Sequence, residues 1–371
     1  MRIAIDASRT TVKQPTGTER YALRLLQTLI DLNARRSAPH ELLLYFREAP
    51  ATALFPNQAF VMQRVIPLAR LWTHARFAAA LAQDKPDVTF VPAHTLPFVF
   101  GGRAAVTVHD LGYCHFPRMH PTAQRMYLDL TTRYSVGRAD LILADSQATA
   151  DDLQRFYGVH SGKIRVVYPG VDAPSVGDRA AVRRKYGLPE RYFLFVGTLQ
   201  PRKNIERLVR AYMRYHKAAP NPAALVLVGG RGWLYDPAWT AGVEGLILAG
   251  YADEADKGTL YAGALALVFP SLYEGFGFPL LEAMHCGIPV IASSTSSLPE
   301  LAGEAALLVD PLEIDALAAA MQLVAEDAAL RAELSARGSV QAQHFTWEKA
   351  AEAALRTLED AAHMSPPLQM S

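Results

Sequence analysis

The sequence predicts an α/β protein made of two doubly wound units, each with a parallel sheet between helices. Short apolar runs alternate with longer amphipathic stretches along the whole chain, which indicates repeated βαβ units. The alternation restarts after a segment rich in proline and glycine, Tyr168–Gly177. The length of 371 residues also favours two domains, at roughly 100–200 residues each.

In the first half, seven apolar runs have the length and composition of buried strands. They are residues 3–7, 42–46, 61–66, 87–91, 104–108, 141–144 and 164–168. Helices are expected between several of them, where apolar residues recur with helical spacing. These helices are residues 19–31, 71–83, 122–137 and 148–157.

The second half repeats the pattern. Its expected strands are residues 192–196, 225–228, 246–249, 265–269, 290–292 and 306–309. Its expected helices are residues 205–217, 257–264, 279–286 and 313–326. We therefore expect domains at 1–172 and 173–346, with a last helix at 347–363 that packs back on the first domain.

The composition excludes several classes of protein. A formal net charge of +1 argues against a nucleic-acid binder, which normally has a strong basic excess. Cys114 and Cys286 lie far apart, which argues against a disulfide framework and suits a reducing cytoplasm. Met1–Asp6 reads as a strand rather than a signal peptide, and no apolar run approaches the ~20 residues that span a bilayer. We expect a cytoplasmic protein.

The segment Ser271–Glu282 carries the clearest site pattern. Glu274 and Glu282 flank a turn that contains Gly275 and Gly277, and Pro279 stands where a helix would begin. Glycines let a backbone approach a ligand, and a helix start attracts anions. A ligand with both phosphates and hydroxyls, such as a nucleotide-sugar, suits this combination. The alternative is that Glu282, in or near the first turn, only complements the helix dipole among ordinary turn glycines.

Further candidates follow other strands, at the sheet edge where doubly wound proteins bind ligands. Arg202 and Lys203 precede a helix near Asn204, and their charges would stabilise a departing diphosphate. They could instead form a solvated basic loop. Asn204 is expected to cap the helix rather than bind a ligand. Tyr251 follows the expected strand 246–249.

The first domain offers weaker signals. Gly17 lies in a loop before a helix and could approach a phosphate or sugar. His109 follows the strand 104–108 and could reach a sugar hydroxyl, or could be a structural histidine bonded to nearby backbone. Asp110 could orient His109 or cap the next turn. His94, His115, His120 and Asp110 are too loosely spaced for a metal site, so we expect metal-independent chemistry.

Together these motifs resemble the family-four retaining glycosyltransferases of GT-B architecture. The matching segments are Thr107–Leu111, Gly197–Asn204, Pro270–Glu282, Ser297–Glu300 and Ala305–Pro311. The resemblance covers nearly the whole chain and implies two Rossmann-like domains that face a central cleft. In detail the chain is similar to bacterial mannosyltransferases of O-antigen or exopolysaccharide synthesis.

The resemblance implies a role for each candidate. Glu282 would hold the ribose hydroxyls, Arg202 and Lys203 would clamp the diphosphate, and His109 would face the reacting sugar. Glu274 would contact the donor sugar, helped by backbone N–H groups of the turn. The implied donor contacts are Gly17, Thr198, Arg202, Lys203, Tyr251, Glu274, Gly275, Phe276, Gly277, Phe278 and Glu282. Many relatives carry arginine where this chain has Thr198. Arg202 and Lys203 would therefore supply more of the positive charge that binds the diphosphate.

The implied reaction transfers a hexose, with mannose from GDP-mannose favoured, to a saccharide or lipid-linked saccharide and without a cofactor. Four alternatives stay open: another donor (UDP-, ADP- or TDP-sugar), a nucleotide-sugar epimerase, a glycoside hydrolase that uses the two glutamates, and a two-domain sugar receptor. A hydrolase would leave the basic pair unused.

Peripheral contact with the cytoplasmic face of the inner membrane is a further expectation. Arg70 and Arg76 lie among the apolar residues Leu68, Leu71, Trp72 and Phe77, and the loop 91–100 is rich in aromatic and aliphatic side chains. A basic helix that carries aromatic residues is a plausible interfacial element. The alternative is that its apolar face packs on the sheet.

Overall fold

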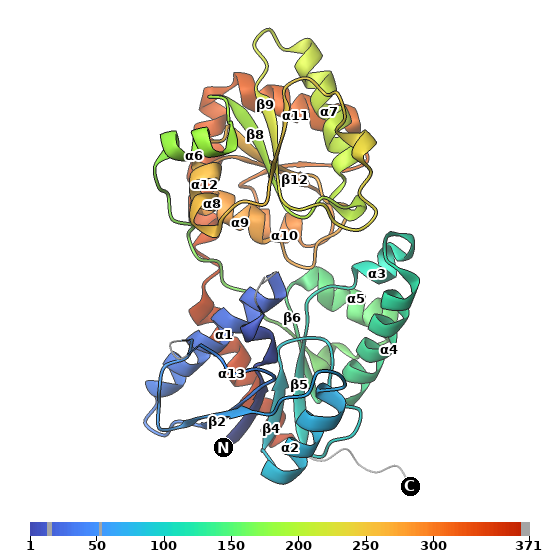
Figure 1. The fold of residues 1–371 in the computed structure, drawn as a ribbon, viewed down its shortest axis with the longest axis vertical. Coiled ribbons are helices and arrows are strands. Elements are labelled where there is room, and N and C mark those ends of the chain that lie inside the picture. The colour runs from blue at the N-terminus through green and yellow to red at the C-terminus, as the bar shows by residue number, and fades with distance from the viewer. Residues whose placement is uncertain (13–16, 52–53, 365–371) are drawn as a thin grey trace. The chain divides into compact units, whose positions relative to one another are not determined.

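The computed structural model describes residues 1–12, 17–51 and 54–364, and the chain forms two compact units (Figure 1). The first unit comprises residues 1–114, 121–170 and the chain from 346 onward. The second comprises residues 115–120 and 171–345. The change of unit at residue 170 lies two residues before the expected boundary, and the return at 346 lies one residue before the expected final helix.

The first unit contains a seven-stranded parallel sheet in the order β3-β2-β1-β4-β5-β6-β7. Its strands are β1 (Arg2–Asp6), β2 (Glu41–Phe46), β3 (Val61–Val65), β4 (Val88–Val91), β5 (Arg103–Val108), β6 (Leu141–Ala144) and β7 (Ile164–Val166). All are close to the expected ranges. The strand order reverses between β1 and β4, which is the switch point where doubly wound sheets open toward ligands.

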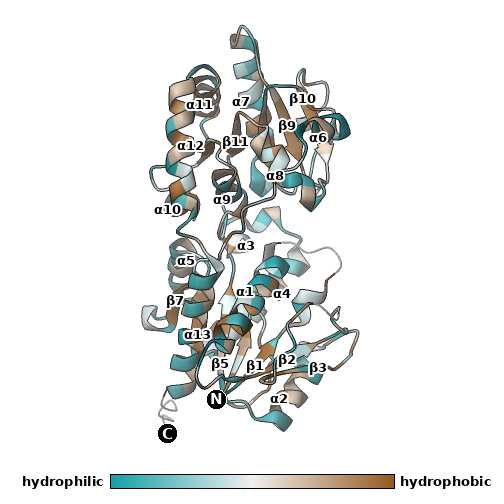
Figure 2. Ribbon diagram, turned by 90° about the vertical axis from the view of Figure 1, so that its left-hand side faces the viewer, coloured by the Kyte–Doolittle hydropathy of each residue, from teal (hydrophilic) through white to brown (hydrophobic). Residues whose placement is uncertain are grey.

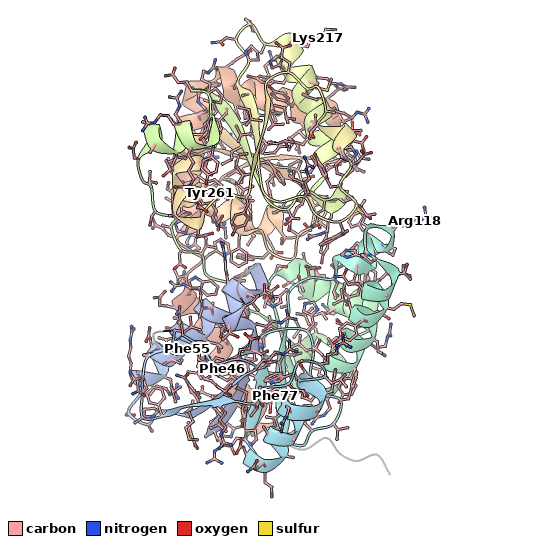
Figure 3. The ribbon with its side chains drawn as sticks, viewed as in Figure 1. Phe46, Phe55, Phe77, Arg118, Lys217 and Tyr261 are labelled. Carbon is pink, nitrogen blue, oxygen red and sulfur yellow. The ribbon has the colours of Figure 1, made fainter. Side chains whose placement is uncertain are left out.

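The helices of the first unit are α1 (Gly17–Ala34), α2 (Ala78–Asp84), α3 (Gly112–His115), α4 (Thr122–Arg138), α5 (Gln147–Tyr157) and α13 (Trp347–His363). Short turns of helix are η1 (Ser8–Thr11), η2 (Thr73–Phe77), η3 (Pro117–Met119, in the second unit) and η4 (Ser161–Lys163). The expected helix 71–83 begins instead with η2, a π-helical turn, and Leu71 lies outside it with a left-handed φ of 57°. Its aromatic residue Phe77, labelled in Figure 3, is fully buried. The Phe77 ring packs on Tyr45, with ring centroids 5.2 Å apart.

Helix α13 returns to the first unit and packs beside α1 and β5. The indole ring of Trp347 lies 6.2 Å from the ring of Tyr21, centroid to centroid. At the other end Glu359 accepts hydrogen bonds from Arg36 (2.7 Å) and pairs with His40 (2.9 Å). The helix is therefore part of the core layer of the first unit, although it follows the second unit in sequence.

The second unit contains a six-stranded parallel sheet in the order β10-β9-β8-β11-β12-β13. Its strands are β8 (Tyr192–Val196), β9 (Ala224–Val228), β10 (Leu246–Gly250), β11 (Ala266–Phe269), β12 (Val290–Ser293) and β13 (Leu307–Val309). Strands β9 and β11 are mainly brown in Figure 2, because they carry buried leucine and valine toward both helical layers. The predicted fold class, two doubly wound units, is confirmed.

The helices of the second unit are α6 (Arg179–Tyr186), α7 (Ile205–Ala218), α8 (Glu254–Ala262), α9 (Phe278–His285), α10 (Leu298–Ala302), α11 (Ile314–Glu326) and α12 (Ala328–Ala342), with short turns η5 (Pro201–Lys203) and η6 (Pro237–Trp239). Sequence reasoning missed α6, α10 and α12. Helix α6 has readable signals, since Asp178 caps its first N–H groups and Gly187 ends it with a φ of 62°. Helix α12 shows little amphipathic contrast and forms against α9 and α11.

Candidate functional site

The loop after β8 is fixed by the loop after β9. The N–H of Leu199 donates to the carbonyl of Gly230 (2.9 Å), and the N–H of Gly232 donates to the carbonyl of Leu199 (2.9 Å). Gly229 has a φ of 143°, and a side chain there would overlap the carbonyl of Gly197. The loop Gly229–Gly232 is a part of the site that sequence reasoning missed. Its signal was a glycine-rich turn directly after a strand.

Arg202 and Lys203 converge on one carboxylate at the carboxyl edge of this sheet. The ammonium of Lys203 lies 2.5 Å from Oε1 of Glu274, and Nη1 of Arg202 lies 3.3 Å from its Oε2. Arg202 also donates to the carbonyl of Tyr273 at 2.6 Å. All three charged side chains are largely buried. The structure thus brings together three of the predicted residues, and they do not form a solvated basic loop.

The surroundings of Glu274 favour its charged form. Burial by itself would raise the pKa of this carboxyl group, but Lys203 and Arg202 outweigh it, so the pKa is lowered. The ammonium of Lys203 also lies 5.0 Å from the centre of the Phe269 ring. Two cations against one carboxylate make a cluster with an excess of positive charge, which suits a diphosphate.

Asn204 corrects one expectation. It stands at the start of α7 in the left-handed conformation (φ 60°), but its side chain makes no capping hydrogen bond. Instead its amide donates to the carbonyls of Pro270 (3.0 Å) and Pro311 (2.7 Å). Asn204 therefore ties the basic loop to the segments after β11 and β13, because a buried amide satisfies its donors wherever carbonyls are within reach.

The turn Gly275–Phe278 leads into α9 as predicted, with Pro279 in the first turn of the helix. Gly277 has a φ of 146°, and a Cβ there would lie 2.8 Å from Cδ2 of Leu298. The hydroxyl of Ser297 donates to the carbonyls of Glu274 (3.0 Å) and Phe276. The N–H of Glu274 donates to Oγ of Ser296 at 3.0 Å. The loop after β12 thus sets the shape of the turn.

Glu282 is the fifth residue of α9 and does not lie in its first turn. Its Oε1 accepts a hydrogen bond from Lys257 (2.6 Å) and its Oε2 accepts one from Tyr261 (2.8 Å), both from α8. All three residues are buried. Its place argues against a mere complement to the helix dipole, whose effect is confined to the first turn. Sequence reasoning missed Lys257 and Tyr261.

The remaining donor candidates of the second unit lie at the same edge of the sheet. Tyr251 follows β10 and is 72% exposed, and Thr198 follows β8 and is exposed. Arg231, which was not predicted, follows β9 in the glycine-rich loop and lies 5.4 Å from the ring centre of Tyr235. A further cation therefore lies in the loop that pairs with the Thr198 segment.

In the first unit, His109 is held by an aspartate that the sequence did not single out. Its Nδ1 lies 2.7 Å from Oδ2 of Asp145, which follows β6, and its Nε2 lies 3.2 Å from the carbonyl of Pro92. Burial would lower the pKa of His109, but the Asp145 carboxylate outweighs it and raises the pKa. Asp110 caps the next turn, since its Oδ1 accepts the N–H of Gly112 at 2.8 Å.

His94 and Gly17 are two further candidate positions in the first unit. His94 accepts the N–H of His109 at 2.9 Å, and burial together with His109 lowers its pKa to about 4. His94 is therefore neutral near pH 7. Gly17 is the first residue of α1, and the residues before it, 13–16, lie outside the described part of the chain.

Among the described residues, no group of three or more His, Cys, Asp or Glu side chains gathers as a metal site would require. Metal independence stays a prediction. Within the same residues, no helix has the length and apolar content to cross a bilayer.

A doubly wound unit with two cations and a carboxylate at its strand ends, and a second carboxylate on the helix that follows, is typical of proteins that bind phosphorylated, hydroxyl-rich ligands. Comparison with known proteins identifies the class more closely. The family model described as "Glycosyltransferase Family 4" matches residues 15–175, and the family model described as "Glycosyl transferases group 1" matches residues 178–341. The chain belongs to the family-four glycosyltransferases of GT-B architecture, and it is a glycosyl-transferring enzyme.

Individual relatives agree with this assignment. The O-antigen chain mannosyltransferase B of Escherichia coli is 35% identical over 289 residues, which are 75% of this chain and 76% of that protein. The serotype-specific mannosyltransferase WbdA of Escherichia coli is 27% identical over 352 residues, 81% of this chain but 41% of that protein. The structure of sucrose-phosphate synthase from Thermosynechococcus elongatus shares the fold, with a TM-score of 0.75, 23% identity, and coverage of 97% and 98% of the two chains.

Proposed function

We propose that this enzyme transfers mannose from GDP-mannose, with retention of configuration, to a saccharide or lipid-linked saccharide during synthesis of a cell-surface polysaccharide. The names of its relatives support the sugar and the process. The observation that carries the donor site is the buried cluster of Lys203, Arg202 and Glu274 at the strand ends of the second unit. Glu282 lies on the helix that begins directly after this cluster.

Each residue takes a role that its surroundings allow. Lys203 and Arg202 would bind the diphosphate and stabilise the charge that grows as the sugar–phosphate bond breaks. Glu274, held in its charged form by the same two cations, would accept hydrogen bonds from the hydroxyls of the donor sugar. Glu282 would accept the ribose hydroxyls, and Tyr251 and Thr198 would border the nucleotide.

Retention would follow from attack on the face that the nucleotide leaves. The bond between the anomeric carbon and the diphosphate oxygen breaks, and a bond forms between that carbon and the acceptor oxygen on the same face. The proton of the acceptor hydroxyl passes to the departing phosphate oxygen. His109 would face the reacting sugar, with its imidazole oriented by Asp145 and held at Nε2 by the carbonyl of Pro92.

Two alternatives differ in measurable ways. A glycoside hydrolase would need the two glutamates to act as a pair across one bond, at about 5–5.5 Å for a retaining enzyme. Here Glu274 is engaged by Lys203 and Arg202, whereas Glu282 is engaged by Lys257 and Tyr261. Hydrolysis of a simple glycoside without a nucleotide would favour the hydrolase. Conversion of a nucleotide-sugar without an acceptor would favour an epimerase.

A donor screen tests the proposal. Thermal shift is measured with GDP, UDP, ADP and TDP and then with their sugar conjugates, because ligand binding stabilises the folded state by mass action. We expect GDP and GDP-mannose to give the largest shifts and Glu282→Ala to reduce them. Transfer from GDP-mannose, with the anomeric configuration of the product read by NMR, completes the test. A larger shift with UDP and transfer only from a UDP-sugar would refute the mannose assignment.

We also propose that the first unit contacts an anionic membrane surface. Leu71 is 70% exposed and Val99 is 79% exposed, and the side chains of Arg70 and Arg76 lie at the surface. Phe98, which precedes Val99 in the sequence, stacks on His74 with ring centroids 4.0 Å apart. We name the exposed residues Leu71, Phe98, Val99, Arg70 and Arg76 the apolar–basic surface.

The structure corrects part of the expected interfacial helix. Trp72 and Phe77, which sequence reasoning placed in the same interfacial helix, are buried in the core of the first unit. Their alternative interpretation, an apolar face packed on the sheet, is correct for these two residues. The apolar–basic surface therefore combines loop residues with Arg76 of η2 and is not the face of one amphipathic helix.

A further inference from the structure

The buried face of α8 presents two hydrogen-bond donors to a single carboxylate. Lys257 and Tyr261 are four residues apart and so lie on the same side of the helix. The ammonium of Lys257 lies 2.6 Å from Oε1 of Glu282, and the hydroxyl of Tyr261 lies 2.8 Å from Oε2. Each oxygen of Glu282 thus has its own donor from α8.

These contacts are not a surface ion pair. The whole Lys257 residue is 9% exposed and Tyr261 is fully buried. Burial, to which Glu282 adds, raises the pKa of Tyr261 far above its usual value, so the phenol keeps its proton and donates. Glu254, one turn earlier on α8 and more exposed, also contacts Lys257 at 3.1 Å. Burying an ion pair costs desolvation energy, so its presence here calls for a reason beyond stability.

A carboxylate fixed in this way suits a vicinal diol. Each carboxylate oxygen has two lone pairs, and α8 occupies one on each oxygen. One acceptor position per oxygen is left, and the two positions are held at a fixed spacing and orientation. A ribose offers two neighbouring O–H donors. Without its α8 partners, Glu282 could turn about its side-chain bonds and meet one hydroxyl at a time.

We propose that Lys257 and Tyr261 are positioning residues that fix Glu282 for the ribose diol and so give this enzyme its preference for ribonucleotides over deoxyribonucleotides. This proposal rests on the proposed role of Glu282 as the ribose contact. It adds α8 to the donor site, as an element that need not touch the nucleotide itself.

The test compares ribose with deoxyribose. The dissociation constants of GDP, 2′-deoxy-GDP and 3′-deoxy-GDP are measured by calorimetry, with the corresponding uridine nucleotides in parallel because the ribose contact does not depend on the base. The wild-type enzyme should bind the ribonucleotide at least about tenfold more tightly than either deoxy form, since a lost hydrogen bond to a charged group has this effect. In Lys257→Met the ratio should fall to about threefold or less.

Three further variants separate positioning from general damage. Tyr261→Phe removes one donor while keeping the ring, and should reduce the preference for ribose even if Lys257→Met does not fold. Lys257→Arg should restore part of the preference. Lys217→Met, at the exposed end of α7 far from Tyr261 within the same unit, should leave the ratio unchanged (Figure 3).

The outcomes separate the role of Glu282 as the ribose contact from the positioning role of Lys257 and Tyr261. A wild-type enzyme that binds ribo- and deoxyribonucleotides equally would overturn the assignment of Glu282 to the ribose, and this proposal with it. A wild-type preference that survives intact in folded Lys257→Met, or in Tyr261→Phe if Lys257→Met is unfolded, would overturn the positioning role alone.

Discussion

At the scale of single residues, the donor site is a balance of buried charges. Lys203 and Arg202 neutralise Glu274, and the lowered pKa of Glu274 ties their interaction to pH. The interaction stabilises the fold fully above the unfolded-state pKa of the carboxyl group, and this contribution is lost as the pH falls through the lower folded-state value. The second unit should therefore lose stability in acid.

Replacing Lys203 should affect turnover more than substrate binding. Lys203→Ala removes a cation that opposes the charge of the leaving diphosphate, so kcat should fall by about 100-fold with a smaller change in KM. Arg202→Ala should act in the same direction. Steady-state kinetics measures both, with Lys217→Ala as a control at an exposed position. Wild-type turnover in both site variants would mean that the diphosphate is bound elsewhere.

Asp145→Asn should shift the titration of His109. The carboxylate of Asp145 raises the pKa of His109 against the effect of burial, so its removal should move the midpoint to lower pH and leave the imidazole neutral over a wider range. NMR of the histidine ring protons follows this shift directly. Asp110→Asn should produce a smaller shift, because Asp110 contributes less to the raised pKa. An unmoved midpoint in Asp145→Asn would contradict the assigned pair.

At the scale of elements, the site depends on loops that hold one another. The segment after β8 is hydrogen-bonded to the segment after β9, and serines after β12 bond the turn before α9. Glycines are required where backbones approach closely, at Gly229, or where φ is positive against a packed helix, at Gly277. The local geometry of the anion site is therefore a property of several strand ends together.

Gly277→Ala should damage both stability and donor binding. Its φ of 146° is strained for any side chain, and the added Cβ would lie 2.8 Å from Leu298. A residue in a sparsely populated conformation costs about 1–3 kcal/mol. We expect a lower Tm and weaker nucleotide binding, measured by thermal shift and calorimetry.

The matched control is Gly137→Ala in α4, where φ is not positive and an added Cβ meets nothing within 4 Å. There, alanine in place of glycine should stabilise the helix by roughly 0.5–1 kcal/mol. If Gly277→Ala behaved like Gly137→Ala, the turn before α9 would not need the conformation seen here.

At the scale of the whole molecule, the chain builds two units of the same architecture but gives them different chemistry. The second unit supplies cations and carboxylates, and the first supplies a histidine oriented by an aspartate. The chain passes between the units four times, because residues 115–120 belong to the second unit and α13 returns to the first.

Activity should survive a chelator. Lys203, Arg202 and the start of α9 already supply positive potential for the diphosphate. Transfer is measured after EDTA treatment and again with added Mg²⁺ or Mn²⁺, and we expect the same rate throughout. Loss of transfer that a divalent cation restores would overturn this expectation.

Binding to anionic vesicles should depend on the apolar–basic surface. Sedimentation with anionic and neutral vesicles should show preference for the anionic lipid, because the exposed arginines and apolar side chains belong to the same two segments, residues 70–76 and 98–99. Arg70→Glu/Arg76→Glu should abolish the preference, whereas Arg179→Glu/Arg184→Glu, an equal charge change on α6, should retain it. Equal and negligible sedimentation with both lipids would contradict membrane contact.

The sequence by itself determined the two doubly wound units and their strands, because alternating buried strands and amphipathic helices leave a periodic record in the chain. It also determined that Glu274, Arg202 and Lys203 follow strand ends, since each lies directly after or near an apolar run. The helices α6, α10 and α12 were missed because they are short or weakly amphipathic and are stabilised by their neighbours.

Only the tertiary structure decided which side chains meet. Asp145 reaches His109 because β6 lies beside β5 in the sheet, although 36 residues separate the two side chains. Lys257 reaches Glu282 because α8 packs against α9. The sequence also left Trp72 and Phe77 open between core and surface, and packing placed them in the core. The physical reason is the same each time: local pattern sets an element, but contacts between distant elements depend on the order in which the strands pair.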